Sequence, residues 1–387
     1  MRWLSAVAMV VGCRSSDPGP TTQLVAYAGD TAIEAGTTVV SHHADGTIID
    51  QQTTDGAGRA AVGYEPGAYV TVIYTRDTAI QLLTAPALTT GTLAIHGPEP
   101  TRASIIAGTL VLTAVPIAAD AYSIDLGCIT LPVTTLPMYT GINAYCFGRD
   151  SNIDVLVRAT NAGVLVGYFA TRVPVDNEVG MLDIPAWSTT PLEIPVQNGP
   201  GASIVFTEVV DTLAHATPTA TGDTVFAWDG LRADATRVRA TLGTATASQI
   251  TTQYLAGVPT SVTLTADEFL PAPTTSLTFD GASGFAWTAF GIGDVTNVHA
   301  TWGTIVWDAV LDPSTAAIAI PQLGSGLGLT APGSDLATTL RAIDGPDTKG
   351  FTDVQAAGIY VEATADASIV PPPATGDVRE ASVTGFH

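Results

Sequence analysis

The sequence has few basic residues, and lysine is almost absent. Its 387 residues include 14 Lys and Arg against 36 Asp and Glu, for a formal net charge of −22, and Lys349 is the single lysine. Because proteins bind nucleic acid mainly through Lys and Arg contacts to phosphates, this balance excludes nucleic acid as an expected partner. The 46% of hydrophobic residues is too high for a disordered chain and predicts a sizeable buried core.

Complete catalytic motifs are missing as well. Ser283 follows Gly281 by two residues, but Phe285 stands where the nucleophile elbow needs a second glycine. The glycine-rich run at 324–328 contains no lysine and follows no strand-helix pattern, which is not typical of a phosphate loop. We therefore predict that the protein is not an enzyme and needs no cofactor, although carboxylates that pair only in three dimensions leave no mark in a sequence.

Metal-ligand residues are present without the spacing that a metal site needs. The segment Asp150–Asp154 opens like a calcium-binding loop, but Val155 and Asn161 stand where the loop requires glycine and glutamate. His42 and His43 are adjacent, so in a strand their side chains point to opposite faces and cannot bind one ion together. We interpret the first segment as a polar turn and the histidines as part of a hairpin, and we predict no metal.

The N-terminus has the parts of a secretory signal. Arg2 precedes the apolar run Leu4–Val11, which is shorter than the roughly 20 residues of a membrane-spanning helix, and Gly12 and Cys13 follow. We predict a signal peptide over residues 1–12. The alternative is a cytosolic chain that happens to start with an apolar run.

The segment Val10–Cys13 resembles the lipobox of bacterial lipoproteins. In that family the signal is cut before the cysteine, which carries the lipid. The resemblance implies that Cys13 is lipidated, that residues 13–20 are a tether, and that the protein is extracytoplasmic and anchored to a bacterial membrane, the outer one by expectation. Two or more acyl chains make such anchoring stable.

The remaining cysteines, Cys128 and Cys146, are an even pair for an oxidising compartment. The loop between them contains Pro132, Pro137 and Gly141, turn-forming residues that could bring its ends together. We predict a disulfide between the two. A metal-binding pair and a reactive thiol are the alternatives, and no histidine or third cysteine lies near in sequence to support them.

Most segments alternate apolar and polar residues and are rich in Val, Ile and Thr, as in Tyr69–Tyr74 and Ser261–Thr265. With 38 glycines and 25 prolines, turn-forming residues interrupt these runs at short intervals. We predict an all-β fold of tandem antiparallel β-sandwich modules, immunoglobulin-like or transthyretin-like. The one helical candidate is Ser334–Ile343, where apolar residues recur at helical spacing.

Residues 21–97 carry four segments in a specific order: Gly36–Val40, Ala44–Thr47, Thr54–Ala60 and Gly67–Val72. This order resembles the carboxypeptidase regulatory-like (transthyretin-like) β-sandwich, in which an Asp-Gly hairpin precedes a Thr-Asp-x-x-Gly-Arg segment. The resemblance implies a fold and no activity. Asp-Gly at 45–46 is also a hairpin signal in its own right.

Beyond residue 97 one pattern occurs three times. Two aromatic residues separated by one residue, which is Cys146 in the first copy and alanine in the other two, are followed after nine or ten residues by Val-x-Ala-Thr, with His as x in the third copy. The copies start at Tyr145, Phe226 and Phe285, and their valines are Val157, Val238 and Val298. We interpret them as repeated sandwich modules over residues 98–200, 201–275 and 276–370, with 371–387 as a tail or a last strand. Chance reuse of common strand residues is the alternative.

Trp287, Trp302 and Trp307 lie close together in sequence and could stack on a sugar if exposed, but we interpret Trp287 as a core residue. These observations predict a lipid-anchored envelope protein with a structural or adhesive role and a protein or glycan ligand. The alternative is an envelope carbohydrate-binding or hydrolytic protein with an acidic site between modules.

Overall fold

The computed structural model describes residues 20–386 except the segments 29–31, 77–78, 98–107, 127–129, 134, 143–151, 175–178, 209–213, 217–221, 229–234, 245, 273–276, 282–283, 324–331, 334 and 361–374. The regular secondary structure of the described residues is nearly all strand, with one α-helix, α1 (Phe351–Ala357), and one short 3-10 helix (Ala266–Glu268). The predicted all-β sandwich class is confirmed.

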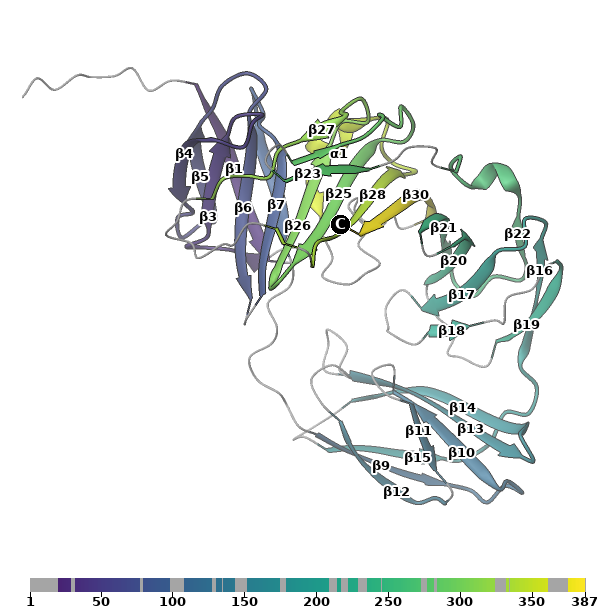
Figure 1. Ribbon diagram of the computed structural model, residues 1–387. Helices are drawn as coiled ribbons and strands as arrows, with labels where there is room; N and C mark the ends of the chain where they lie inside the picture. Colours follow the sequence, from purple (N-terminus) through teal and green to yellow (C-terminus); the bar gives the residue numbers. More distant parts are fainter. Residues whose placement is uncertain are drawn as a thin grey trace, which may run out of the picture.

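Three successive stretches of the chain fold into sandwiches with the same strand order (Figure 1). The first unit contains β1 (Thr21–Ala28), β3 (Thr38–His42), β4 (Ile48–Thr53), β5 (Arg59–Gly63), β6 (Tyr69–Arg76), β7 (Ala79–Pro86) and β8 (Thr92–Gly97). The second contains β9 (Gly108–Ala114), β10 (Ala121–Asp125), β11 (Thr130–Val133), β12 (Met138–Ile142), β13 (Asn152–Asn161), β14 (Val164–Pro174) and β15 (Val179–Ile184). The third contains β16 (Leu192–Asn198), β17 (Ser203–Glu208), β18 (Ala214–Ala216), β19 (Thr224–Trp228), β20 (Ala235–Gly243), β21 (Ala247–Ala256) and β22 (Val262–Leu264).

In each unit a group of three strands packs against a group of four. The groups of three are β5-β1-β8, β12-β9-β15 and β19-β16-β22, and the groups of four are β4-β3-β6-β7, β11-β10-β13-β14 and β18-β17-β20-β21. In all three units the first and last strands are parallel neighbours. The sheets are therefore mixed, which corrects the expectation of purely antiparallel modules.

The repeated Val-x-Ala pattern lies at the same place in the second and third units. Val157 and Ala159 belong to β13, Val238 and Ala240 belong to β20, and all four side chains are fully buried between the two sheets. These strands pair on both sides, so small and β-branched side chains fill the core at alternate positions. The shared strand order supports duplication, and it extends to the first unit, where no copy of the pattern was expected.

The C-terminal unit has a different arrangement. A small sheet of β23 (Thr278–Asp280), β24 (Gly284–Ala286) and β27 (Ala317–Ile318) packs on β25 (Val295–Trp302), β26 (Ile305–Leu311) and β28 (Ala337–Asp344), which β30 (Gly376–Phe386) extends. The two-residue strand β29 (Ile359–Tyr360) instead joins the first unit beside β8, and β2 (Ala32–Ile33) joins β1. Val354 of α1 and Ile359 are buried in the core of the first unit, so a segment late in the sequence contributes to the core of the N-terminal sandwich.

A twelve-stranded sheet joins three of the four units. Its order is β18-β17-β20-β21-β30-β28-β25-β26-β7-β6-β3-β4. The third unit joins through the antiparallel pair β21 and β30, and the first unit joins through the parallel pair β26 and β7. The second unit contributes no described strand to this sheet and lies apart from it in Figure 1.

Side chains reinforce the junction between the first and C-terminal units. The indole N–H of Trp307 donates to Thr84 Oγ1 at 2.8 Å, Thr84 and Thr71 share a hydrogen bond of 2.7 Å, and Thr71 Oγ1 lies 2.9 Å from His42 Nε2. Trp307, the two threonines and His42 are all buried. A continuous polar chain thus crosses from β26 through β7 and β6 to β3.

The structure corrects two expectations from the sequence and decides between the two alternatives of a third. Ser334–Ile343 was expected as a helix, but Ala337–Asp344 is strand β28, because pairing with β25 and β30 on both sides outweighs a weak local preference. Strand β16 (Leu192–Asn198) pairs within the third unit, so the division between the second and third units falls before residue 192 instead of at 200. Of the alternatives for 371–387, residues 376–386 form the last strand.

Candidate functional site

The twelve-stranded sheet has one face rich in polar side chains, which we call the polar face. Strand alternation places Val238, Val298 and Ala300 in hydrophobic cores, so their neighbours Arg239, Asn297 and His299 point to the opposite side. Cross-strand partners share a face, and register therefore continues this side through β21, β30, β28 and β26. The polar face spans the third and C-terminal units.

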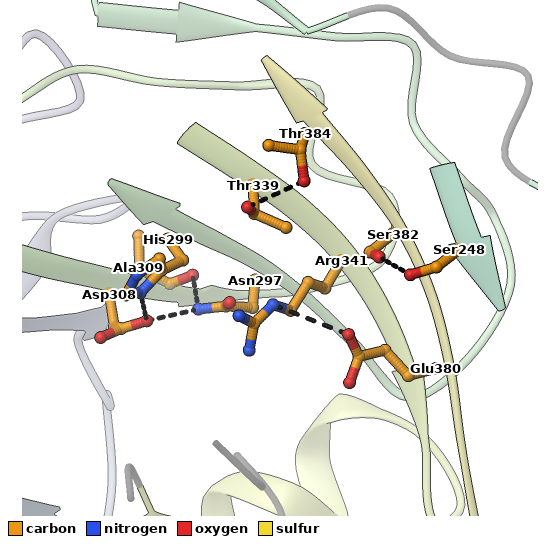
Figure 2. A network of polar contacts seen from close by, with 10 residues as sticks. All are labelled: Ser248, Asn297, His299, Asp308, Ala309, Thr339, Arg341, Glu380, Ser382 and Thr384. Atoms are coloured by element: carbon orange, nitrogen blue, oxygen red, sulfur yellow. Dashed lines mark hydrogen bonds and ion pairs between the residues drawn. The ribbon is translucent and has the colours of Figure 1, made fainter. Parts of the chain in front are cut away.

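One end of the polar face holds a histidine-aspartate pair (Figure 2). His299 Nδ1 lies 2.9 Å from Asp308 Oδ1, and the Asp308 side chain is only 2% exposed. Buried Asn297 reaches the same carboxylate oxygen at 3.4 Å and the Ala309 carbonyl at 3.3 Å through its amide nitrogen. A buried carboxylate that accepts from Nδ1–H fixes the orientation of the imidazole, which is half of an acid-base arrangement.

No nucleophile completes this pair among the residues that the structure describes. The nearby hydroxyls hydrogen-bond to one another instead: Ser248 to Ser382 at 2.7 Å and Thr339 to Thr384 at 3.2 Å. Asn297 Oδ1 is buried without a hydrogen-bond partner in the described part of the chain. An unpaired buried acceptor is unfavourable, so this end of the face is suited to a ligand or water that donates a hydrogen bond.

From Arg341, the cross-strand partner of Asn297, towards β20, the polar face is basic. Arg341 Nε lies 3.7 Å from Glu380 Oε1, with side chains 10% and 20% exposed (Figure 2). Arg239 and Arg237 project from β20 on the same face as Glu380. Burial lowers the pKa of Arg239, the neighbouring Arg237 and Arg341 lower it further, and Glu380 opposes the shift. This part of the face can bind negatively charged groups.

The sequence predicted other site residues than those of the polar face. Cys13, Cys128 and Cys146 fall outside the described residues, as do Ser283 and the run 324–328. The polar turn expected at 150–154 needs correction, because Asn152, Ile153 and Asp154 already belong to strand β13, while residues 150 and 151 lie outside the described residues. No group of three or more His, Cys, Asp or Glu side chains suited to a metal ion occurs in the described residues.

Two other sequence interpretations are tested by burial. Trp287, Trp302 and Trp307 are at most 7% exposed and pack in one core cluster, which confirms the core interpretation of Trp287. His42 and His43 do diverge: His42 is buried and its pKa is lowered to about 4, chiefly by desolvation, while His43 lies 3.5 Å from Glu65 at the surface. Asp45 and Gly46 occupy the turn between β3 and β4, as the hairpin signal predicts.

The residues of the polar face were not singled out from the sequence. A usable signal was present, because Arg237 and Arg239 flank the core residue Val238 in a chain with only 14 basic residues. Two arginines at alternate positions of a strand mark its non-core face. Which other strands add to that face depends on pairing between residues more than 100 apart in sequence, such as Ser248 and Ser382.

Comparison with known proteins gives little. No protein-family model matches the chain, and no curated protein matches it. A solved structure, the Bacillus anthracis TIE protein, is similar with a TM-score of 0.18 at 11% identity, over 63% of this chain and 50% of that one. The chain thus spans about half of that structure, and a similarity this weak carries no argument. No helix among the described residues is long and apolar enough to cross a membrane.

Proposed function

We propose that the protein is a lipid-anchored envelope protein with a structural or adhesive role, whose β-sandwich units hold a binding face for a protein or glycan. The observation that carries this proposal is the twelve-stranded sheet, which joins three units by main-chain hydrogen bonds. Units joined in this way cannot swing on flexible linkers. Such a frame suits a protein that holds a binding face at a fixed orientation.

The anchor is the part of this proposal that is easiest to test. We expect Cys13→Ser to abolish palmitate labelling and to release the protein from the membrane fraction, because the lipid would be attached to that sulfur. Cys128→Ser is the matched control and should keep both the label and the membrane association. Unchanged labelling of the Cys13→Ser variant would refute the anchor.

We also propose the disulfide between Cys128 and Cys146, both of which lie in the sequence of the second unit. No described strand of this unit joins the shared sheet, and a closed loop of this length contributes about 3 kcal/mol in the chain-entropy model. Peptide mapping of unreduced protein should recover the two cysteines in one linked peptide. Two alkylated thiols in the unreduced protein would refute the bridge.

A hydrolytic role is the second candidate, and the His299–Asp308 pair is the observation that favours it. A sugar-binding tryptophan row receives no support from Trp287, Trp302 or Trp307, because all three are buried. If the protein hydrolyses an envelope substrate, His299→Ala should abolish turnover. If its role is adhesive, the same variant should keep most of its binding. Equal hydrolysis by the wild-type protein and the His299→Ala variant would exclude His299 as the base.

A further inference from the structure

Three of the 14 basic residues of this chain share the polar face. Arg237 and Arg239 belong to β20 and Arg341 belongs to β28, while Glu380 on β30 lies between these two strands. Among the described residues of this face, three arginines against Glu380 and Asp308 give a formal charge of +1, although the whole chain carries −22. The charge balance of this part of the face is therefore opposite to that of the protein.

The arrangement is costly for the protein in the absence of another anion. Arg341 is 8% exposed, and Arg237 and Arg239 are partly buried. The Nε atoms of Arg237 and Arg341 are buried without a hydrogen bond in the described residues, and Arg341 Nε has only the longer ion-pair contact of 3.7 Å with Glu380. Like charges that share a partly desolvated site repel, and unpaired buried donors carry a further penalty, so an additional acceptor with negative charge would relieve both.

We propose that this part of the polar face binds an oxyanion, meaning a carboxylate, sulfate or phosphate group. Guanidinium groups present paired N–H donors that match two oxygens of such a group. Tyr254 and Ser382, the cross-strand partners of Arg237 and Arg341, are buried beside them, and Ser382 shares a hydrogen bond of 2.7 Å with Ser248. The inference goes beyond the proposed function and holds whether or not Cys13 is lipidated.

The size of the ligand is limited by the charge of the rest of the protein. At the ionic strength of a cell, electrostatic interactions fall off over about 8 Å. A single anionic group at the arginines is therefore attracted, whereas a long polyanion that also covers acidic surface is repelled. The site suits one or two oxyanion groups carried by a small molecule or by one residue of a larger ligand.

Full-length protein titrated with inorganic phosphate, sulfate and succinate tests the proposal. Calorimetry at constant ionic strength, with chloride as the reference anion, should show saturable binding of at least one of the three, and the melting temperature should rise with it. The ranking of phosphate, sulfate and succinate then distinguishes the sources of the anionic group. Arg239→Gln should weaken binding about tenfold or more, as the loss of a charge-assisted hydrogen bond predicts.

Two further variants make the outcome independent of folding defects. Glu380→Gln removes the carboxylate that competes for the arginines, so it should strengthen anion binding, and a merely damaged protein would not do this. Arg59→Gln changes an exposed arginine at the start of β5, in the first unit, and should leave binding unchanged. Absence of binding in the wild-type protein, which would follow if a carboxylate of the chain already neutralised the arginines, overturns the proposal, and so does equal binding by the Arg239→Gln variant.

Discussion

The second and third units have the same strand order but different neighbours at their edges. In the third unit the last strand of the larger group, β21, pairs with β30 of the C-terminal unit along eight residue pairs. The corresponding strand of the second unit, β14, has its outer side bridged by the chain that leads to the third unit: Tyr168 and Ser188 exchange two main-chain hydrogen bonds of 2.8 and 2.9 Å. One edge is extended by a strand, and the other is covered by a linker.

Gly167 favours the close approach of the linker to β14. Gly167 lies in β14 where a Cβ atom would come within 2.6 Å of Ile117 Cδ1 and 3.1 Å of Trp187 Cβ, so glycine lets the linker approach the strand closely. The Trp187 indole then donates to the Val115 carbonyl at 3.0 Å, which holds the linker in place. Covering an exposed strand edge with a loop is a recognised way to prevent further pairing. The sandwich itself is thus the same in both units, and the edge determines whether it joins the shared sheet.

We expect the largest effect from a substitution that destabilises the shared sheet and leaves the stability of the second unit unchanged. Trp307→Ala removes a fully buried ring from the junction of the first and C-terminal units and leaves Thr84 without its donor, which should cost about 3–5 kcal/mol. Because the second unit has its own core, we expect calorimetry to show one lowered transition and one unchanged transition.

Ile124→Ala provides the reciprocal control. Ile124 is fully buried in the second unit, so its truncation should lower the transition that Trp307→Ala leaves unchanged. If each substitution lowered both transitions equally, the second unit would be coupled to the shared sheet, and the contrast drawn between the two regions would fail.

A pH-dependent loss of stability should also be confined to the shared sheet. Burial lowers the pKa of His42 from 6.5 to about 4, so between these values the unfolded chain binds a proton that the folded chain does not. Stability contributed by neutral His42 is therefore present above pH 6.5 and lost as pH falls towards 4. The full loss is about 3 kcal/mol.

The polar chain gives the physical reason for this loss. With Nδ1 donating to the His43 carbonyl at 3.2 Å, Nε2 accepts from Thr71, and the chain ends at Trp307, which can only donate. Protonation of Nε2 leaves the Thr71 hydroxyl proton without its acceptor. Urea unfolding at pH 7 and pH 4.5 should show a smaller pH effect in His42→Asn, while His43→Gln, at the surface, should behave like the wild-type protein. An identical pH effect in His42→Asn would disprove the assignment.

The sequence predicts the local parts of this molecule better than the way they combine. Alternation of Val238 and Ala240 predicts a strand with one core face, and Asp45-Gly46 predicts a hairpin, because both depend on neighbours a few residues away. Pairing of β7 with β26 joins residues more than 200 apart, and no local pattern specifies it. The polar face depends on the same long-range pairing. That Arg341 and Glu380 share this face follows only from the pairing of β28 with β30, which the sequence does not specify.

The smallest expected effect concerns the covered edge of the second unit. Gly167→Ala places a methyl group against Ile117 and Trp187, and because the Ile117 contact is the end of a flexible side chain, we expect a loss of about 1–2 kcal/mol in the second-unit transition alone. If the linker is displaced, Tyr168 loses its two main-chain bonds to Ser188 and the edge of β14 becomes available for pairing, so sedimentation should also show concentration-dependent association. Gly163→Ala separates this effect from the general cost of removing a glycine. No atom lies within 4 Å of a Cβ at that turn position, although its φ of +79° adds strain, so this variant should be destabilised without association. If both variants associated equally, destabilisation alone would be the cause, and the linker would not be what keeps the second unit out of a shared sheet.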